Sequence, residues 1–264
     1  MPKLSRLLVI PDVHQDTSFL QHIFRNESLS EWDRVIFLGD FFDAKRPDYA
    51  NVASVAWICD FVIELKRELK ERMVMLLGNH DVVFHALSCY PERLSRQQRE
   101  MLLDLYGFTT WPTIESCGYH LDPSFFEDIR LCHTEGGWLF SHAGVTLDTW
   151  NAFTTSSLGT CAAAEQFMSN LNPWVDQPMP DNGDLLPIPL FQAGQTRGGF
   201  LDKGGPLWLD WDEEFEDSLP LPQIVGHTVD STYRINGRSY CLDARQSVYA
   251  RVHGSVVEPV IFPR

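Results

Sequence analysis

The first 80 residues repeat one pattern three times: a short apolar, β-branched run, then a polar turn, then residues at helical spacing. The apolar runs cover residues 6–10, 34–38 and 73–77. This alternation predicts strands joined by helical crossovers, and therefore a parallel sheet in an α/β fold. In open α/β sheets, ligands bind in the crevice beyond the carboxyl ends of such strands. The polar turns that follow the three runs are therefore the first place to look for function.

A crossover helix is predicted between the second and third runs. Its apolar residues recur at intervals of three and four, which places them on one helical face over about five turns. They are Val52, Val55, Ala56, Cys59, Val62, Ile63 and Leu69.

Beyond residue 84 the pattern is weaker. A polar helical stretch is predicted near Ser95–Leu105, and turn-rich sequence up to residue 123 carries no predicted chemistry. Residues 129–132 and 138–141 flank Glu135-Gly136-Gly137, which is typical of a β-hairpin. A short helix is expected around Ala162–Leu171.

The chain is expected to form a single domain over residues 1–264, because its length fits one large α/β core. Within it, the Pro/Gly-rich sequence at about 146–205 is interpreted as a lid or insertion. The short, turn-separated apolar runs between residues 224 and 257 predict a terminal antiparallel sheet.

Charge and cysteine content narrow the classes of function. Asp and Glu outnumber Lys and Arg by 36 to 21, so a chain of net charge -15 is not expected to bind extended nucleic acid. The six cysteines form no CxxC pair and are interpreted as reduced thiols, not as structural zinc ligands. No apolar run approaches the roughly 20 residues of a membrane span, so a cytoplasmic protein without a membrane partner is expected. The oligomeric state stays open.

Five polar clusters follow strand-like segments. They are Asp12-x-His14, Gly39-Asp40-x-x-Asp43, Gly78-Asn79-His80-Asp81, Ser141-His142-Ala143-Gly144 and Gly226-His227-Thr228. Gathered in one crevice, these carboxylates, imidazoles and the amide would be destabilised by desolvation and like-charge repulsion, and two divalent cations would remove that penalty. Oxygen and nitrogen ligands without thiolate favour manganese first, with iron, zinc, nickel or cobalt as alternatives. Asp40 is the natural bridge between two ions roughly 3.5–4 Å apart.

In order and spacing, these clusters resemble the calcineurin-like metallophosphoesterase superfamily. The Ser-His-Ala-Gly-Val block, the single Gly-His-Thr and the preceding Pro206-Leu207-Trp208 are similar to the phosphoprotein-phosphatase-like branch, which includes serine/threonine phosphatases and diadenosine tetraphosphate hydrolases. The resemblance implies a four-layer α/β/β/α sandwich with the metal site at the strand C-terminal ends. It also implies two divalent metal ions, one held by Asp12, His14 and Asp40, and the other by Asp40, Asn79, His142 and His227.

His80, held by Asp43, would by the same resemblance donate a proton to the leaving oxygen. The implied activity is hydrolysis of phosphate monoesters, on phosphoproteins or small molecules, by direct attack of a metal-bridging hydroxide. Two alternatives stay open: a nucleotide phosphodiesterase or pyrophosphohydrolase, such as a dinucleoside polyphosphate hydrolase, and a non-catalytic metal-binding interaction scaffold.

The sequence departs from the branch at two places. Pro11 and Gln15 replace glycines of the first block, and Asp43-Ala44-Lys45-Arg46 stands where the branch has Asp-Arg-Gly. The phosphate-binding arginine is therefore not fixed by the motif. Arg46 and Arg197 are the candidates for substrate binding. Arg46 lies one residue after the position expected from the motif of the branch, and Arg197 lies in a turn flanked by glycines.

Overall fold

The computed structural model describes residues 5–49, 51–89, 92, 95–96, 121–176 and 191–262. Its strands form two five-stranded sheets. The first sheet contains, in spatial order, β10 (Val256–Ile261), β9 (Val248–His253), β1 (Arg6–Ile10), β2 (Arg34–Phe37) and β3 (Met73–Met75). The second contains β4 (Cys132–Glu135), β5 (Trp138–Ser141), β6 (Gln223–Val225), β8 (Ser239–Cys241) and β7 (Arg234–Asn236).

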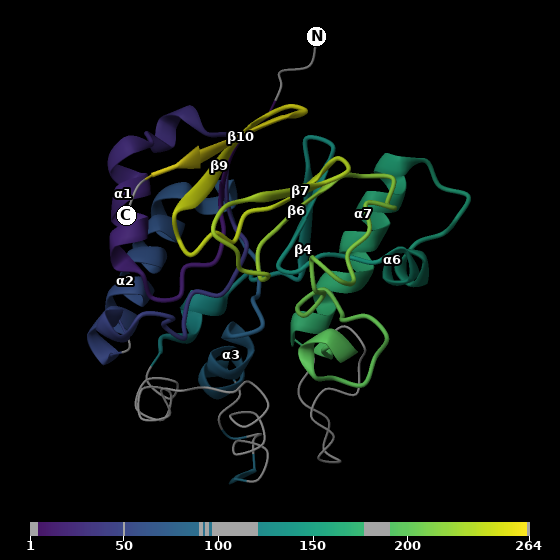
Figure 1. The fold of residues 1–264 in the computed structure, drawn as a ribbon. Helices are drawn as coiled ribbons and strands as arrows, with labels where there is room; N and C mark the ends of the chain where they lie inside the picture. The colour runs from purple at the N-terminus through teal and green to yellow at the C-terminus, as the bar shows by residue number, and fades with distance from the viewer. Residues whose placement is uncertain are drawn as a thin grey trace.

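Within the residues that the structure describes, five α-helices accompany these sheets. They are α1 (Thr17–Asn26), α2 (Val52–Leu69), α3 (Asp81–Cys89), α6 (Leu147–Phe153) and α7 (Thr160–Leu171). Short 3-10 helices cover Leu29–Glu31, Pro47–Tyr49, Lys70–Arg72, Pro123–Phe126, Asn172–Asp176 and Gln195–Arg197. In Figure 1, α1 and α2 lie on one side of the paired sheets, and α6 and α7 lie on the other.

The alternation of side chains along β1 explains why helices cover the outer face. Leu7 and Val9 belong to the apolar cluster that also contains Phe140 of the second sheet, so they pack between the sheets. Leu8 and Ile10 belong to the cluster that contains the buried face of α2. Because successive strand residues point to opposite faces, an apolar strand of this kind must be covered on both sides. The predicted four-layer α/β/β/α sandwich is confirmed.

The predicted parallel order of the first three strands is confirmed. β1 pairs in parallel with β2, and β2 pairs in parallel with β3. The crossover helix α2 begins after Asn51, whose side chain accepts a hydrogen bond from the Ser54 N–H at 3.0 Å, as an N-cap does.

The buried face of α2 is rotated from the predicted one. Val52 and Ala56 are exposed, whereas Ile58 and Leu65 are buried beside Val55, in addition to most of the predicted positions. This helix carries more apolar residues than one face can hold. Periodicity alone therefore could not choose among them.

The prediction of one terminal antiparallel sheet is wrong. β9 and β10 form an antiparallel hairpin that attaches beside β1, while β7 and β8 form a second hairpin in the other sheet. β6 is parallel to both β5 and β8. Turn residues specify each hairpin locally, but the pairing partner of a short strand depends on which apolar face it buries, and this is set by distant parts of the chain.

The predicted hairpin forms, but its first strand begins at Cys132 and not at Ile129. Arg130 instead continues the edge of the first sheet, where its N–H donates to Met75 O at 3.0 Å and its carbonyl accepts from Leu77 N–H at 2.8 Å. The chain therefore passes from one sheet to the other directly before β4.

Residues 147–171, within the predicted lid or insertion, form α6 and α7, and α7 packs against β4 with Phe167 and Leu171 buried. The helix predicted around Ala162 is therefore confirmed, and α6 was not predicted. Residues 177–190 of that segment, and most of the stretch predicted as helical at Ser95–Leu105, lie outside the described residues. That this segment is a lid stays a prediction.

The five cysteines in the described part of the chain are free thiols, in agreement with the sequence interpretation. Among the described helices, none is both long enough and apolar enough to cross a membrane.

Candidate dinuclear metal centre

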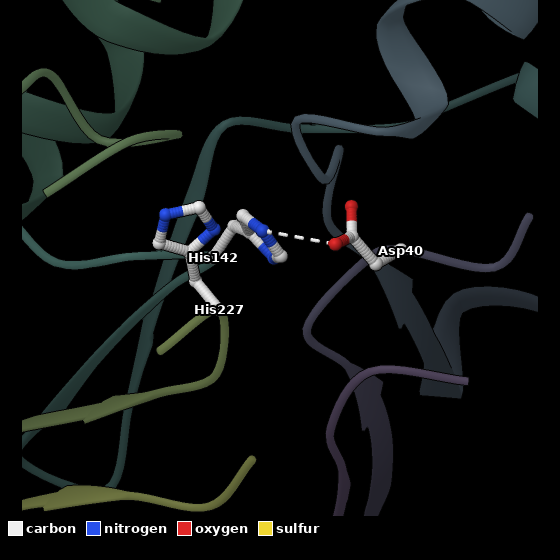
Figure 2. A group of neighbouring side chains, drawn as sticks. All are labelled: Asp40, His142 and His227. Carbon is white, nitrogen blue, oxygen red and sulfur yellow. Dashed lines mark ion pairs between the residues drawn. The ribbon is translucent and has the colours of Figure 1, made fainter. Parts of the chain in front are cut away.

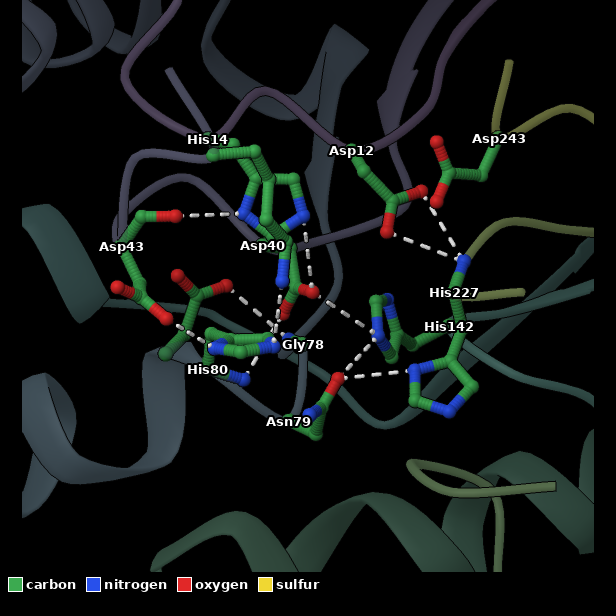
Figure 3. A network of polar contacts seen from close by, with 12 residues as sticks. Asp12, His14, Asp40, Asp43, Gly78, Asn79, His80, His142, His227 and Asp243 are labelled. Atoms are coloured by element: carbon green, nitrogen blue, oxygen red, sulfur yellow. Dashed lines mark hydrogen bonds and ion pairs between the residues drawn. The ribbon is translucent and has the colours of Figure 1, made fainter. Parts of the chain in front are cut away.

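The predicted site residues lie at the carboxyl ends of five strands. β1 leads to Asp12 and His14, β2 to Asp40, and β3 to Asn79, while His142 and His227 follow β5 and β6 (Figure 3). The first three strands are mutually parallel and so are β5 and β6, which is why their ends converge. The loops are joined through their backbones, since the N–H groups of Val13 and His14 both donate to Asp40 O, at 2.9 and 2.8 Å.

Four of these residues have left-handed backbone conformations. The φ angles are 44° at His14, 51° at Asp40, 62° at Asp43 and 68° at His227. Such conformations cost a non-glycine residue about 1–3 kcal/mol when the surroundings impose them, and they concentrate at functional sites. The strand-end turns are therefore held in a geometry that local preference alone would not select.

Two glycines allow unusually close packing around the acidic residues. A Cβ at Gly78 would lie 2.1 Å from Asp40 Oδ1, and a Cβ at Gly226 would lie 2.0 Å from Asp12 Oδ2. No side chain fits at either position without moving a carboxylate. Both glycines are therefore required for the close approach of the neighbouring loop.

Asp12, His14 and Asp40 form the first potential ligand group, with their donor atoms within 4.8 Å of one another. His14 Nε2 lies 3.6 Å from Asp40 Oδ2. Asp12 accepts the backbone N–H of His227 on both oxygens, at 3.0 and 3.1 Å. All three side chains are buried, and burial raises the pKa of both carboxyls, with mutual repulsion among the acidic groups adding to the shift.

Asp40, His142 and His227 form the second group, and Figure 2 shows the three side chains together, with His142 directed at the Asp40 carboxylate. His142 Nε2 lies 3.5 Å from Asp40 Oδ2. Asn79 completes the set, because its Oδ1 lies 2.9 Å from His142 Nε2 and 2.9 Å from His227 Nδ1. Asp40 is common to both groups, as expected of a bridge.

The protonation of His142 tests whether a cation fits here. Its Nδ1 lies 2.9 Å from Leu38 O, so this nitrogen carries the proton and donates to the carbonyl. Burial lowers the pKa of His142 to about 3, so the ring holds no second proton. Nε2 therefore presents a lone pair to the oxygens of Asn79 and Asp40.

His14 repeats this arrangement. Its Nδ1 lies 2.9 Å from Asp43 O, burial lowers its pKa, and Nε2 faces Asp40. Donor atoms whose lone pairs converge repel one another unless a proton or a cation lies among them, and the raised pKa values of Asp12 and Asp40 show that keeping these carboxylates charged without a cation is costly. The residues present therefore fit two metal ions, and each ligating imidazole has the backbone partner that fixes its tautomer.

His80 and Asp43, the predicted proton donor and its partner, are brought together. His80 Nδ1 lies 2.7 Å from Asp43 Oδ2, and the His80 backbone N–H donates to Asp40 Oδ1 at 2.9 Å. The other ring nitrogen, Nε2, lies 3.2 Å from Lys45 Nζ. Burial lowers the pKa of His80, Asp43 opposes this shift, and Lys45 adds to it.

The two candidate arginines behave differently. Arg46 is not brought into the site: its guanidinium lies 3.7 Å from Asp16 and over the ring of Tyr49. Arg197 lies beside the second ligand group, where Nη2 donates to Thr228 Oγ1 at 2.9 Å and Nε pairs with Asp210 at 2.8 Å. Its charge is therefore already compensated by a carboxylate.

Two buried acidic residues were not assigned a role from the sequence. Asp243 lies next to Asp12 (Figure 3), and burial raises its pKa to about 6. Asp81 accepts the backbone N–H groups of Phe41 and Gly78, at 2.9 and 3.1 Å, and so joins two of the site loops. Asp243 follows β8 as the other acidic residues follow their strands, so the same positional rule would have found it.

The fold and the site together define an α/β/β/α protein with a candidate dinuclear metal centre at its strand ends. Comparison with protein families agrees, because the calcineurin-like phosphoesterase family matches residues 5–229. The chain belongs to this family and is a hydrolase acting on phosphoric ester bonds.

Solved structures of other proteins share this fold. A cold-active protein-tyrosine phosphatase of a psychrophilic Shewanella species is 14% identical, with a TM-score of 0.52, over 98% of this chain and 82% of that one. A serine/threonine phosphatase from Saccharomyces cerevisiae is 13% identical, with a TM-score of 0.51, over 98% and 81%. At these identities the likeness shows the fold alone. No curated protein sequence matches the chain.

Proposed function

We propose that the chain is a dinuclear metal-dependent phosphatase that hydrolyses phosphate monoesters. The observation that carries this proposal is the convergence of unprotonated imidazole nitrogens and carboxylate oxygens on Asp40, at 3.5 and 3.6 Å. This arrangement is costly while Asp40 is ionised and no cation is bound, and it suits two cations.

Asp12, His14 and Asp40 would hold one ion, and Asp40, Asn79, His142 and His227 the other. Oxygen and nitrogen donors without thiolate make manganese the first choice, with iron, zinc, nickel or cobalt as alternatives. When bound, the ions would supply Lewis-acid chemistry at these residues, because divalent cations polarise phosphoryl oxygens and make water a stronger nucleophile near neutral pH.

His80 supplies the proton for the leaving group. Its Nδ1 pairs with Asp43, which leaves Nε2 as the nitrogen directed toward the substrate. General acid catalysis of this kind contributes about 10²–10⁴-fold to turnover. The ion pair with Asp43 also stabilises the imidazolium form that donation requires.

A second candidate is hydrolysis of a phosphoanhydride, as in a dinucleoside polyphosphate. The same ligand groups and the same proton donor serve both reactions. The two reactions differ in the charge of the leaving group. The ammonium of Lys45 lies beside His80, where it can contact an anionic leaving group.

Metal dependence is the direct test. Purified protein is exhaustively chelated, metal analysis verifies the removal, and hydrolysis of p-nitrophenyl phosphate is followed before and after adding manganese, nickel or cobalt. Chelation should abolish hydrolysis and one of these ions should restore it. Undiminished activity in the verified metal-free protein would rule out the proposed mechanism.

A further inference from the structure

Lys45 occupies a position at the candidate site that neither candidate arginine occupies. Its Nζ lies 3.2 Å from His80 Nε2, the ring nitrogen that does not face Asp43. The ammonium therefore stands beside the very atom that would deliver a proton to the leaving group.

The backbone that carries Lys45 is held on both sides. The Ala44 N–H donates to the buried side chain of Gln15 at 3.1 Å, and Asp43 O accepts from His14 Nδ1 at 2.9 Å. The amide nitrogen of Gln15 also donates to Tyr49 O at 2.7 Å, which fixes the far end of the same loop. Gln15, which replaces a family glycine, thus anchors the segment that places Lys45.

The charge of Lys45 is not neutralised locally. Within the described part of the chain no carboxylate pairs with its ammonium, whereas Arg46 and Arg197 pair with Asp16 and Asp210. Lys45 is exposed, so a ligand can reach it. Burial dominates the pKa shifts of Asp40, His14 and His142, and the Lys45 ammonium contributes to all three, which places its field across the whole centre.

We propose that Lys45 binds the leaving group of the substrate, so that among the phosphate esters hydrolysed at this site a terminal phosphate whose leaving group is itself anionic, as in a nucleoside diphosphate, is bound more tightly. This inference rests on the proposed function, with His80 as the proton donor. The bridging oxygen must come within about 3 Å of His80 Nε2 to take its proton. Lys45 Nζ, next to the same nitrogen, then faces the oxygens beyond the bridge.

In the proposed reaction, the charge that remains on the leaving group depends on the substrate. Water oxygen forms a bond to phosphorus and releases a proton to solvent, while the bond from phosphorus to the bridging oxygen breaks. The bridging oxygen keeps the electron pair and takes a proton from His80. When the leaving group is a nucleotide phosphate, its remaining oxygens stay anionic and pair with Lys45. When it is a serine side chain, the product is a neutral alcohol and offers Lys45 no charge.

The test compares two substrates that differ in this charge. Adenosine diphosphate loses its terminal phosphoryl group and leaves an anionic monophosphate, whereas a phosphoserine peptide leaves a neutral hydroxyl. Lys45→Met should raise the KM for adenosine diphosphate about tenfold, the lower end expected for a charge-assisted contact in an accessible site, and change the KM for the peptide much less. Lys45→Arg, which keeps the charge, should restore most of the affinity.

Lys70→Met is the matched control, because Lys70 lies at the C-terminus of α2, before the amino end of β3 and away from the strand ends that carry the site. It removes the same charge and should alter neither KM. Metal content should be equal in all variants. An equal rise in both KM values would place Lys45 on the transferred phosphoryl group and overturn the proposal, and so would an unchanged KM for adenosine diphosphate.

A binding measurement separates this inference from the proposed function. Calorimetric titration of adenosine monophosphate into the metal-loaded protein should give about tenfold weaker binding in Lys45→Met than in wild type. If metal-loaded wild type hydrolyses neither substrate, the proposed function fails. Equal binding of the monophosphate by wild type and variant would refute the role of Lys45 whether or not hydrolysis occurs.

Discussion

Asp40 is the residue on which both candidate ligand groups depend. It belongs to each group of converging donor atoms, accepts the His80 N–H, and has a left-handed φ of 51°. Asparagine tolerates that backbone conformation nearly as well as aspartate, so Asp40→Asn changes the charge with little added strain. This makes it an informative substitution at the centre.

Asp40→Asn should lower the content of both metals, whereas Asp12→Asn should mainly affect one. The reason is that a bridging carboxylate neutralises charge on two ions, while Asp12 belongs to one ligand group only. Elemental analysis of the purified variants, as metal per chain, measures the difference. Equal metal content in wild type and Asp40→Asn would contradict the bridging assignment.

Substitution of His80 distinguishes proton donation from metal binding. His80→Asn should lose about 10²–10⁴-fold in turnover of an alkyl phosphate, keep both metals, and lose much less on p-nitrophenyl phosphate, whose leaving group needs little protonation. Turnover and metal content are measured on the same preparations. If both substrates slow alike, or a metal is lost, another residue is the proton donor.

At the scale of single residues, the sequence predicted which side chains lie together at the strand ends, but it did not predict every contact among them. Placement at strand ends, together with the family resemblance, selected the six side chains that the structure brings together. Asp243 was missed although it follows a strand-like run in the same way, because the site was drawn only from the five motif clusters and Asp243 lies outside them. The contact of Lys45 with His80 depends on how Gln15 anchors the loop, and a sequence motif does not contain that information.

Among the elements, the turn between β6 and His227 is tightly constrained. Gly226 packs directly on the carboxylate of Asp12, so its lack of a side chain fixes the distance between the two sheets at this point. The loop is also tied to the neighbouring strand end, because the Gly226 N–H donates to His142 O at 2.7 Å.

Gly226→Ala should displace Asp12, lower the metal content and reduce the free energy of unfolding by about 1–3 kcal/mol, as overpacking of a close-packed interior does. Denaturant unfolding of the metal-free protein gives the stability change, and elemental analysis gives the metal content. Gly159→Ala is the control for metal content, since a Cβ there meets no heavy atom within 4 Å and the φ angle is negative; Gly159 is the N-cap of α7, so this variant does not serve as a control for stability. Retention of both metals and of wild-type stability by Gly226→Ala would contradict the packing argument.

The elements themselves were predictable to different degrees. The sequence predicted four elements well, namely β1, β2, β3 and α2. Each has a clear pattern of apolar residues that ends at a polar turn. The terminal strands were found individually but assigned to one sheet, because three- to six-residue strands contain too little pattern to specify distant partners. β9 joins β1 because its Val248, Ala250 and Val252 complete the core between the sheets.

On the scale of the whole molecule, the candidate centre connects the two sheets. Asp12, His14, Asp40 and Asn79 follow strands of the first sheet, while His142 and His227 follow strands of the second. Ions bound to both sets would hold the sheets together at their carboxyl ends. Metal binding should therefore stabilise the fold as well as supply chemistry.

Manganese at 100 times its dissociation constant should add about 2.7 kcal/mol of stability per site, which corresponds to a rise in Tm of roughly 5–10 °C for a domain of this size. Differential scanning calorimetry of chelated and metal-loaded protein measures the shift. Asp40→Asn at the same manganese concentration should show little of it. A Tm independent of metal in the wild type would mean that the ions do not connect the sheets.

The pairing of β1 with β9 affects how the chain is made. β1 lies in the middle of the first sheet, yet Arg6 pairs with His253, so one edge of β1 stays open until the last strands have been synthesised. Contacts between such distant segments slow folding, and an unpaired apolar strand edge invites association with other chains. The nascent protein therefore carries an incomplete first sheet until residues 248–261 have been synthesised, and the hairpin of β9 and β10 closes that sheet.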